Sequence, residues 1–157
     1  ALRGAAENFV KTRVTEGENL SRDLITKLDT MLEHVAFITE RSPKLIQEYK
    51  EKLREKVCEL LDDVQIDENR LYMEVTIFAD KVCVDEELVR LKSHVESTKQ
   101  ALLSGGSIGR KLDFIAQEMN REANTILSKA NDLEISARAI ELKNEIEKVR
   151  EQIQNIE

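Results

Sequence analysis

Apolar residues in the first part of this chain recur at the heptad spacing that is typical of paired α-helices. Five of them follow one another in steps of four, three, four and three residues: Leu24, Leu28, Met31, Val35 and Ile38. This spacing places all five on one side of a helix, where they form a seam that must pack against another element. Val10 and Val14 continue the seam towards the N-terminus, although Gly17 and Ser21 leave its middle thin. The chain is therefore expected to fold from long helices.

Pro43 is the single proline of the chain, and it predicts where the first helix ends. The residue before a proline is disfavoured in the α conformation, so a helix over residues 2–41 should stop there. Ser42 can cap a second helix with Pro43 in its first position, where a missing N–H costs nothing. We therefore predict that residues 43–61 fold back on the first helix as an antiparallel hairpin.

Three further helices are predicted from the same periodicity. Asp67 can cap a third helix that continues to about residue 103, and the loop Ser104-Gly105-Gly106-Ser107 follows it. A fourth helix, capped by Ser107 or a neighbouring glycine, should run to about Lys129. A last helix should follow Asn131 and Asp132. The residues expected to face inward are Leu112, Ile115, Met119, Ala123 and Ile126 in the fourth helix and Ile135, Ala139, Leu142, Ile146, Val149, Ile153 and Ile156 in the last.

The fold class follows from these helices and from what the sequence lacks. No segment alternates strictly between apolar and polar residues, and the chain has only five glycines, which argues against strands and turn-rich β folds. We expect an all-α fold of long antiparallel helical hairpins with coiled-coil-like seams and no sheet. Residues 1–66 should form a projecting helical hairpin and residues 67–157 a C-terminal helical domain.

Composition argues against several classes of function. The net charge is −7, which disfavours tight nonspecific binding of nucleic acid over the whole surface. With no tryptophan, two tyrosines and four phenylalanines, the chain has few residues for an aromatic platform that stacks bases. No apolar run approaches the ~20 residues that cross a bilayer. Cys58 and Cys83 lack metal-ligand spacing with either histidine, so we predict two reduced, mostly buried thiols.

Residues 105–143 are the place where a polyanion would be least repelled, because their basic and acidic side chains balance. Their first part, Gly105 to Lys111, lacks the spacing of a nucleotide P-loop, and no strand precedes it. The N-terminus of a helix followed by Arg110 and Lys111 can still hold a phosphate oxygen. A plain loop before a helix is the competing interpretation.

Two polar stripes are candidates for chemistry. On the third helix, Glu86, Glu87, Arg90 and His94 share one side, which suits a divalent cation or acid–base catalysis. The alternative is an exposed ladder of ion pairs. On the fourth helix, one stripe and its neighbours concentrate carboxylates, amides and guanidinium groups: Arg110, Asp113, Gln117, Arg121 and Asn124, beside Phe114, Glu118, Glu122 and Thr125. Asn and Asp are mediocre helix formers, so this stripe indicates a functional face.

Three segments at and after the fourth helix carry a resemblance to a known family: Gly109–Phe114, Gln117–Thr125 and Glu151–Glu157. Upstream, Glu86–Leu91 and His94 fit the same pattern. Together they closely resemble the C-terminal half of the YicC/YloC-like proteins. The specific match covers about residues 79–157, residues 1–78 fit a less distinctive helical region, and the β-rich N-terminal half of the family is absent.

The resemblance implies an endoribonuclease that cuts single-stranded RNA with the help of Mg²⁺ or Mn²⁺. It also implies a ring-like homohexamer in the bacterial cytoplasm. Together with the polar stripes, it suggests roles for residues of this chain. The expected catalytic residues are His94, Glu118 and Glu122, the metal ligands Glu86, Glu87 and Asp113, and the RNA-binding residues Arg90, Arg110, Lys111, Arg121 and Lys129. Cys83 stands where relatives usually carry Asp, so a carboxylate ligand at that position would be missing. The alternative function is a noncatalytic RNA-binding or helical assembly module.

The third and fourth helices should be antiparallel neighbours, because the turn at Gly105 and Gly106 is short. Counting outward from this turn brings His94 near Gln117 and Glu118, and brings Glu86 and Glu87 near Glu122 and Asn124. Carboxylates clustered in this way repel one another unless a cation lies among them. We therefore expect the metal and the catalytic groups at the contact between these two helices.

Overall fold

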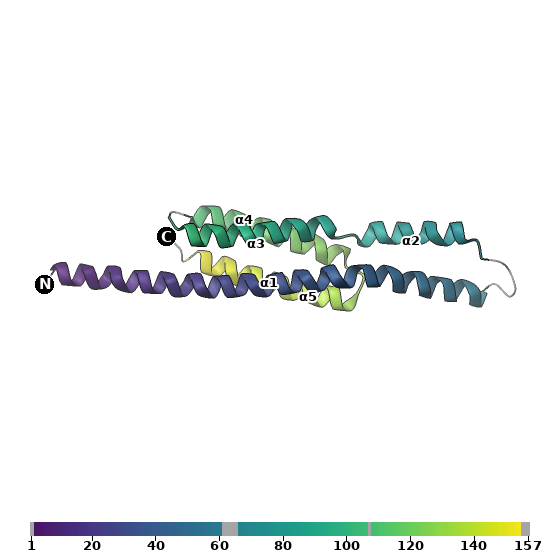
Figure 1. Cartoon of the computed structure of the whole chain (residues 1–157), viewed down its shortest axis with the longest axis horizontal. Coiled ribbons are helices and arrows are strands. Elements are labelled where there is room, and N and C mark those ends of the chain that lie inside the picture. The colour runs from purple at the N-terminus through teal and green to yellow at the C-terminus, as the bar shows by residue number, and fades with distance from the viewer. Residues whose placement is uncertain (1, 61–65, 107, 155–157) are drawn as a thin grey trace.

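The computed structural model describes residues 2–60, 66–106 and 108–154, with side chains from residue 9 onward. All the regular elements in these ranges are helices, which confirms the all-α prediction (Figure 1). They are α1 (Leu2–Leu60), α2 (Glu68–Val82), α3 (Asp85–Ser104), α4 (Gly109–Lys129) and α5 (Leu133–Ile153). No described helix is long and apolar enough to cross a membrane.

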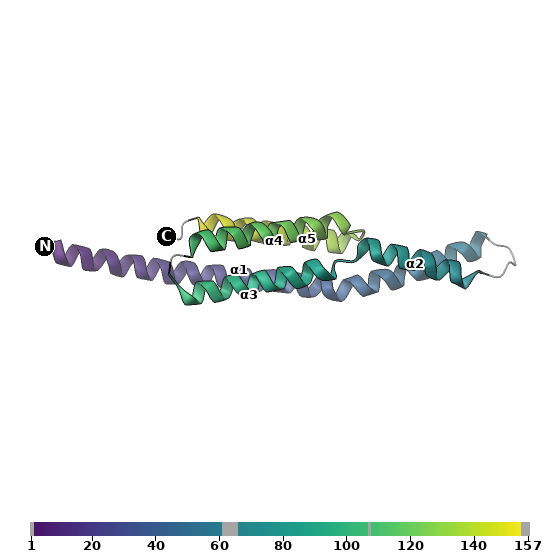
Figure 2. The same cartoon turned by 90° about the horizontal axis from the view of Figure 1, so that it is seen from above.

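The helices are arranged along α1, which runs the whole length of the molecule. α2 and α3 follow one another back along α1, and α4 and α5 lie side by side over its middle (Figures 1 and 2). The middle of α1 therefore forms a four-helix bundle with α3, α4 and α5. One apolar core fills it, and the predicted heptad residues of α1, from Leu24 to Ile38, are all buried there. The inward residues predicted in α4 and α5 are buried as well, through Ile153.

The prediction that the first helix ends before Pro43 is wrong. The helix continues through the proline to Leu60, so a hairpin between residues 2–41 and 43–61 is wrong. Instead, the second half of α1 forms a hairpin with α2. The boundary expected between the projecting hairpin and the C-terminal domain, at residues 66 and 67, lies between these two helices. In the hairpin of α1 with α2, the rings of Tyr49 and Phe78 stack with their centroids 3.8 Å apart.

Contacts on both sides of Pro43 explain why the helix does not break. Arg41 donates two hydrogen bonds across the proline to the carboxylate of Glu48, at 2.7 and 3.0 Å. Arg41 also donates to Asp132 in the α4–α5 turn at 2.8 Å. Leu45, after the proline, still packs against the core. A proline inside a helix costs roughly 3 kcal/mol. Full burial of a leucine contributes roughly 1.5–3 kcal/mol, so the partial burial of Leu45 offsets a part of this cost.

The expected third helix is two helices, so its prediction as one continuous element is wrong. α2 ends at Val82, Cys83 is extended, and α3 begins at Asp85. Val84 between them is buried in the bundle core, which anchors the break. The first turn of α3 carries Asp85, Glu86 and Glu87, and negative charge stabilises the N-terminal end of a helix. Cys83 and Cys58 are both exposed, so the prediction of buried thiols is also wrong.

The predicted cap at Asp67 and the predicted glycine turn are confirmed, whereas two other predicted caps are wrong. Ser42 lies inside α1, and the N-cap residue of α4 is Ile108 and not a neighbouring glycine. Asp67 accepts hydrogen bonds from the backbone N–H groups at the start of α2, and Asp132 does the same for α5. Gly105 and Gly106 have φ of +66° and +88°, in the region that favours glycine. Several predicted features lie outside the described residues: Leu61, most of the break at residues 62–67, the cap at Ser107, and the C-terminal residues 155–157.

The first turns of α1 extend beyond the bundle (Figures 1 and 2). Val10 and Val14, predicted to pair within the chain, are 59% and 55% exposed. Phe9 beside them is exposed too. The apolar seam therefore continues on a helix surface that no described part of this chain covers.

Candidate functional site

The predicted catalytic side chains gather where α3 contacts α4. At 100° per residue, Lys111, Glu118, Glu122 and Lys129 all lie on the side of α4 that faces α3. Two contacts confirm this orientation, because Arg90 of α3 reaches Glu122 and Lys129 reaches Glu87. We call this surface the α3/α4 polar seam and define it by these residues: Glu87, Arg90 and His94 from α3, and Lys111, Glu118, Glu122 and Lys129 from α4.

At one end of the seam, Arg90 joins three carboxylates. Its Nε donates to Oε1 of Glu122 at 2.8 Å, and its Nη atoms lie 3.2 Å from Glu86 and 3.5 Å from Glu87. Lys129 completes the cluster by donating to Glu87 and to the backbone carbonyl of Cys83, both at 3.0 Å. Glu87 and Glu122 are each only 6% exposed. The expected approach of Glu86 and Glu87 to Glu122 is therefore confirmed, with Arg90 between them.

The charges of this cluster set its protonation. Burial alone raises the pKa of Glu87, but the hydrogen bond from Lys129 and the charge of Arg90 outweigh it and hold that pKa below its usual value. The hydrogen bond to Glu122 raises the pKa of Arg90. Glu87 is therefore ionised at neutral pH, and its negative charge is compensated by two cations of the same chain.

At the other end of the seam, beside the turn at Gly105, lies an open cavity of about 490 Å³. Polar side chains from both helices border it: His94, Ser97, Gln100 and Ser104 from α3 and Lys111 from α4. Its apolar wall comes from Ala101, Ile108 and Ile115. Neither the apolar periodicity nor the charge pattern of the sequence indicated Ser97 and Gln100, because both are uncharged and neither belongs to the predicted polar stripes.

Three titratable groups of the seam have no partner among the described residues. The side chains of His94, Lys111 and Glu118 make no hydrogen bond or ion pair there. His94 and Glu118 are half-buried and Lys111 is exposed. Such groups can accept, donate or attract a proton or a phosphate without first breaking an internal contact.

The expectation that Gln117 lies near His94 is wrong. Gln117 lies on the opposite side of α4, where it donates a hydrogen bond to Asp113 at 2.8 Å. Asp113 in turn is paired with Arg150 of α5 at 3.5 Å. The register of α3 and α4 was thus close to the prediction, but the flank of α4 that faces α3 was not predicted.

The expected metal ligands do not come together. Glu86 and Glu87 surround Arg90, whereas Asp113 lies on the α5 side of α4. Across residues 2–60, 66–106 and 108–154, no group of three or more His, Cys, Asp or Glu side chains is placed to hold a metal ion. The described residues therefore do not fit a metal centre on their own.

The five expected RNA-binding residues fall into two groups. Arg90, Lys111 and Lys129 belong to the seam, and the first and last of these are already paired with carboxylates. Arg110 and Arg121 are exposed, three helical turns apart on the side of α4 that faces away from the core. The two arginines are unpaired among the described residues, so they are available to a polyanion.

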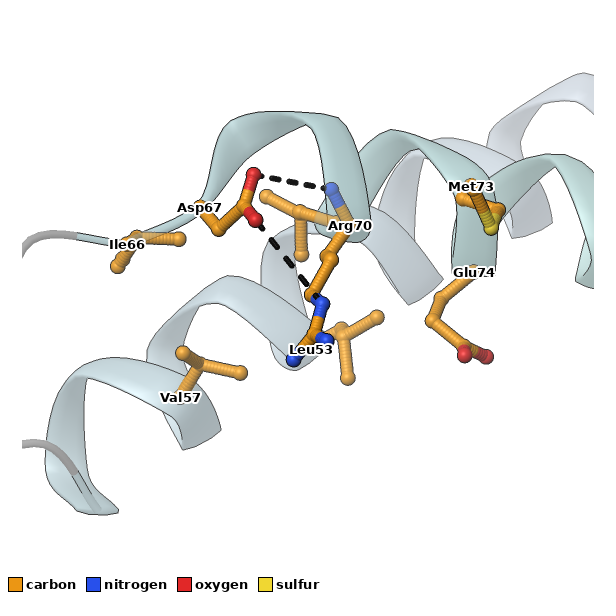
Figure 3. Close-up of a pocket in the computed structure, with 8 residues that line it drawn as sticks. Leu53, Val57, Ile66, Asp67, Arg70, Met73 and Glu74 are labelled. Atoms are coloured by element: carbon orange, nitrogen blue, oxygen red, sulfur yellow. Dashed lines mark hydrogen bonds and ion pairs between the residues drawn. The ribbon is translucent and has the colours of Figure 1, made fainter.

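A second cavity, of about 480 Å³, lies at the tip of the hairpin between the end of α1 and the start of α2 (Figure 3). Leu53, Val57 and Met73 contribute much of its apolar lining. Asp67 and Arg70 lie beside it and contact each other, the Asp67 carboxylate accepting from the Arg70 backbone N–H at 3.4 Å. None of the expected site residues borders this cavity.

Comparison with known proteins identifies the family that the chain resembles. A model of the family described as "Endoribonuclease YicC-like, C-terminal" matches residues 38–157. A protein of Clostridioides difficile (strain 630), named "Probable endoribonuclease YicC", is 46% identical over all of this chain and 54% of its own length. A protein of Haemophilus influenzae with the same name is 40% identical over 96% of this chain and 52% of its own length. The chain thus spans about half the length of these relatives.

Proposed function

The chain belongs to the YicC-like endoribonuclease family, and from this premise we propose that it is the C-terminal helical part of a metal-assisted endoribonuclease that cuts single-stranded RNA. The family match supports an activity on RNA. The α3/α4 polar seam supports a location for it. The proposal concerns the whole protein, of which this chain is about half.

The observation that carries the proposal is the set of unpaired groups on the seam. His94 and Glu118 are half-buried and have no partner among the described residues. His94 borders a cavity that opens to solvent, and Glu118 lies about two helical turns beyond Lys111 on the same side of α4. Cutting a phosphodiester requires one group to take the proton of the attacking hydroxyl and another to protonate the leaving oxygen. An imidazole and a carboxylate can share these roles. Lys111, on the opposite wall, would stabilise the negative charge that develops on the phosphate.

Glu122 takes a positioning role in this proposal. Its carboxylate is buried and accepts a hydrogen bond from Arg90, so it is less accessible to a substrate than Glu118. By holding Arg90, it fixes α3 and α4 at the register that places His94 beside Lys111. Loss of Glu122 is expected to affect both stability and cleavage, whereas loss of Glu118 should affect cleavage alone.

A divalent cation would supply Lewis-acid stabilisation of the phosphate. The donor set within the described residues does not fit one, because the carboxylates around Arg90 are compensated by cations and Asp113 lies elsewhere. We therefore assign no step to the metal. Metal assistance, as part of the proposal, needs ligands from outside the described residues.

The proposed site also requires a path for the RNA. Lys111 on the seam and Arg110 and Arg121 beside it give unpaired positive charge along α4, in an otherwise acidic chain. Arg90 and Lys129 would join them only by exchanging a carboxylate partner for a phosphate. We place the RNA backbone along α4, with the scissile phosphate between Lys111 and His94.

We also propose that the whole protein is a homohexamer acting in the cytoplasm. The exposed apolar residues at the start of α1, Phe9, Val10 and Val14, support association, because contact with another helix would remove them from water. Light scattering on the full-length protein measures the number of copies.

Cleavage of a labelled single-stranded RNA by the full-length protein tests the function. Discrete fragments that a chelator suppresses are expected. Glu118→Gln and His94→Ala should abolish cleavage but retain RNA binding and the melting temperature. Glu96→Gln is the matched control, since Glu96 is an exposed carboxylate on the opposite side of α3. Intact RNA with a mobility shift would instead identify a noncatalytic RNA-binding module. Cleavage at the parent rate by both variants would remove the catalytic groups from the seam.

A further inference from the structure

We propose that the cavity beside the α3–α4 turn binds one nucleobase of single-stranded RNA, and that Ser97 and Gln100 select which base is bound. This inference rests on the proposed function, because it places the base next to the phosphate held between Lys111 and His94. It goes further by assigning two specificity-determining residues that neither the family resemblance nor the sequence patterns indicated.

The size and lining of the cavity suit a base. About 490 Å³ is within the range of ligand pockets, roughly 300–1,000 Å³. Ala101, Ile108 and Ile115 form an apolar wall against which the flat face of a base can lie. The chain has few aromatic residues and none borders this cavity, so aliphatic side chains would take the place of a stacking ring.

The polar side chains of the cavity divide into those that are occupied and those that are free. Ser104 donates its hydroxyl hydrogen to the backbone carbonyl of Gln100 at 2.8 Å, so it is already used. The side chains of Ser97 and Gln100 make no hydrogen bond within the described residues. The amide of Gln100 offers two donors and an acceptor, and the hydroxyl of Ser97 offers a donor and an acceptor.

These free groups match the way in which proteins recognise single strands. Bases of unpaired RNA can turn away from their neighbours and expose their hydrogen-bonding edges, which differ between the four bases. An amide that pairs with one edge leaves donors or acceptors unpaired against another, and that mismatch produces discrimination. Lys111 lies on the α4 side of the cavity and Gln100 on the α3 side. A nucleotide bound between them would contact the first through its phosphate and the second through its base.

Binding of four labelled single-stranded homopolymers to the full-length protein tests the inference. Fluorescence anisotropy in chelator, which is meant to prevent cleavage, is expected to show a difference of about tenfold or more between the best and the worst base. The Ser97→Ala, Gln100→Leu double variant should reduce this difference to about twofold, chiefly by weakening the best base. Its salt dependence should not change, because no phosphate contact is lost.

Gln47→Leu is the matched control, because it makes the same substitution as Gln100→Leu at an exposed position on α1, away from the seam. It should keep the parent preference. Equal affinity of the parent protein for all four homopolymers would overturn the inference, and so would an unchanged preference in a double variant with the parent melting temperature. If the parent neither binds nor cuts RNA, the proposed function fails with it. Loss of base preference with cleavage retained would support both.

Discussion

At the scale of single residues, the α3/α4 polar seam contains a cluster of paired charges around Arg90 and, a few turns away, a group of unpaired polar side chains around His94. Around Arg90, the buried carboxylates of Glu87 and Glu122 are each paired with a cation, and the cluster stabilises the contact of α3 with α4. Around His94, the side chains of His94, Ser97, Gln100 and Lys111 border a cavity and have no partner among the described residues. Compensated buried charge is typical of structural contacts, whereas uncompensated groups beside a cavity are typical of sites. This contrast separates residues that hold the helices from residues that are available to a substrate.

Glu87 makes the stability of the cluster around Arg90 depend on pH. Its folded-state pKa is lowered, so the stability it contributes is present above its unfolded pKa of about 4.3 and is lost as the pH falls through the folded value. Glu87→Gln should destabilise the protein at pH 7 by about 1–2 kcal/mol, at the low end because Lys129 and Arg90 are partly exposed. Melting temperatures of parent and variant should converge as the pH falls through the lowered pKa of Glu87.

Glu86→Gln is the control for this measurement, since the Glu86 side chain is 84% exposed and pairs with the same arginine. It should change the melting temperature little at any pH. A difference between the parent and Glu87→Gln that stays constant from pH 7 to pH 3 would show that the charge of Glu87 does not act through this cluster.

At the scale of elements, α1 keeps a proline that an isolated helix would not tolerate. The missing N–H of Pro43 leaves the carbonyl of Thr39 without its usual helical donor. Pro43 is exposed, so water can reach the backbone at this position. The contacts of Arg41 with Glu48 and Asp132 offset the lost hydrogen bond within the folded molecule. The continuity of the helix therefore depends on the Arg41–Glu48 contact within α1 together with the packing of α1 against the other helices.

Pro43→Ala is expected to stabilise the protein, because alanine restores the helical hydrogen bond. The gain should be about 1–3 kcal/mol, reduced by the greater freedom of the unfolded chain when proline is removed. Thermal and denaturant unfolding followed by circular dichroism measure it. Lys44→Ala, next to the proline and exposed, is the control and should change little. Destabilisation by Pro43→Ala would mean that the proline sets a bend on which the α1 packing depends.

At the scale of the whole molecule, charge limits where RNA can bind. The chain is acidic overall, and the unpaired arginines of α4 lie together on one side of the bundle. Each phosphate contact contributes about 0.7 to the slope of log affinity against log salt for a single strand. Arg110→Ala with Arg121→Ala should therefore flatten that slope by about 1.4. Titrations of a single-stranded RNA at several salt concentrations give this slope.

Arg22→Ala with Lys52→Ala is the control pair, since both residues are exposed on α1. The two substitutions remove the same number of positive charges as the α4 double variant. This pair should leave the slope close to that of the parent protein. If the α4 double variant behaves like the control, RNA binds on another surface and the proposed path along α4 is wrong.

Local patterns were enough to predict the helical class, the buried heptad residues, the cap at Asp67 and the glycine turn after α3. Each depends on residues within one or two turns of each other, so the chain determines it without reference to distant parts. They also located the contact of α3 with α4, because a short turn leaves antiparallel neighbours little freedom of register.

Only the tertiary structure decided whether Pro43 and Val84 interrupt their helices, because burial and ion pairs from distant elements outweigh local preference at both positions. The continuity of α1 depends on Asp132, ninety-one residues from Arg41, and the break before α3 depends on a core built from four helices. The same holds for the candidate site. The residue types on α3 and α4 were evident from the sequence. Which of them compensate one another, and which are left free beside the cavity, depends on which flank of α4 faces α3 and which faces α5. The packing of these three helices decides that.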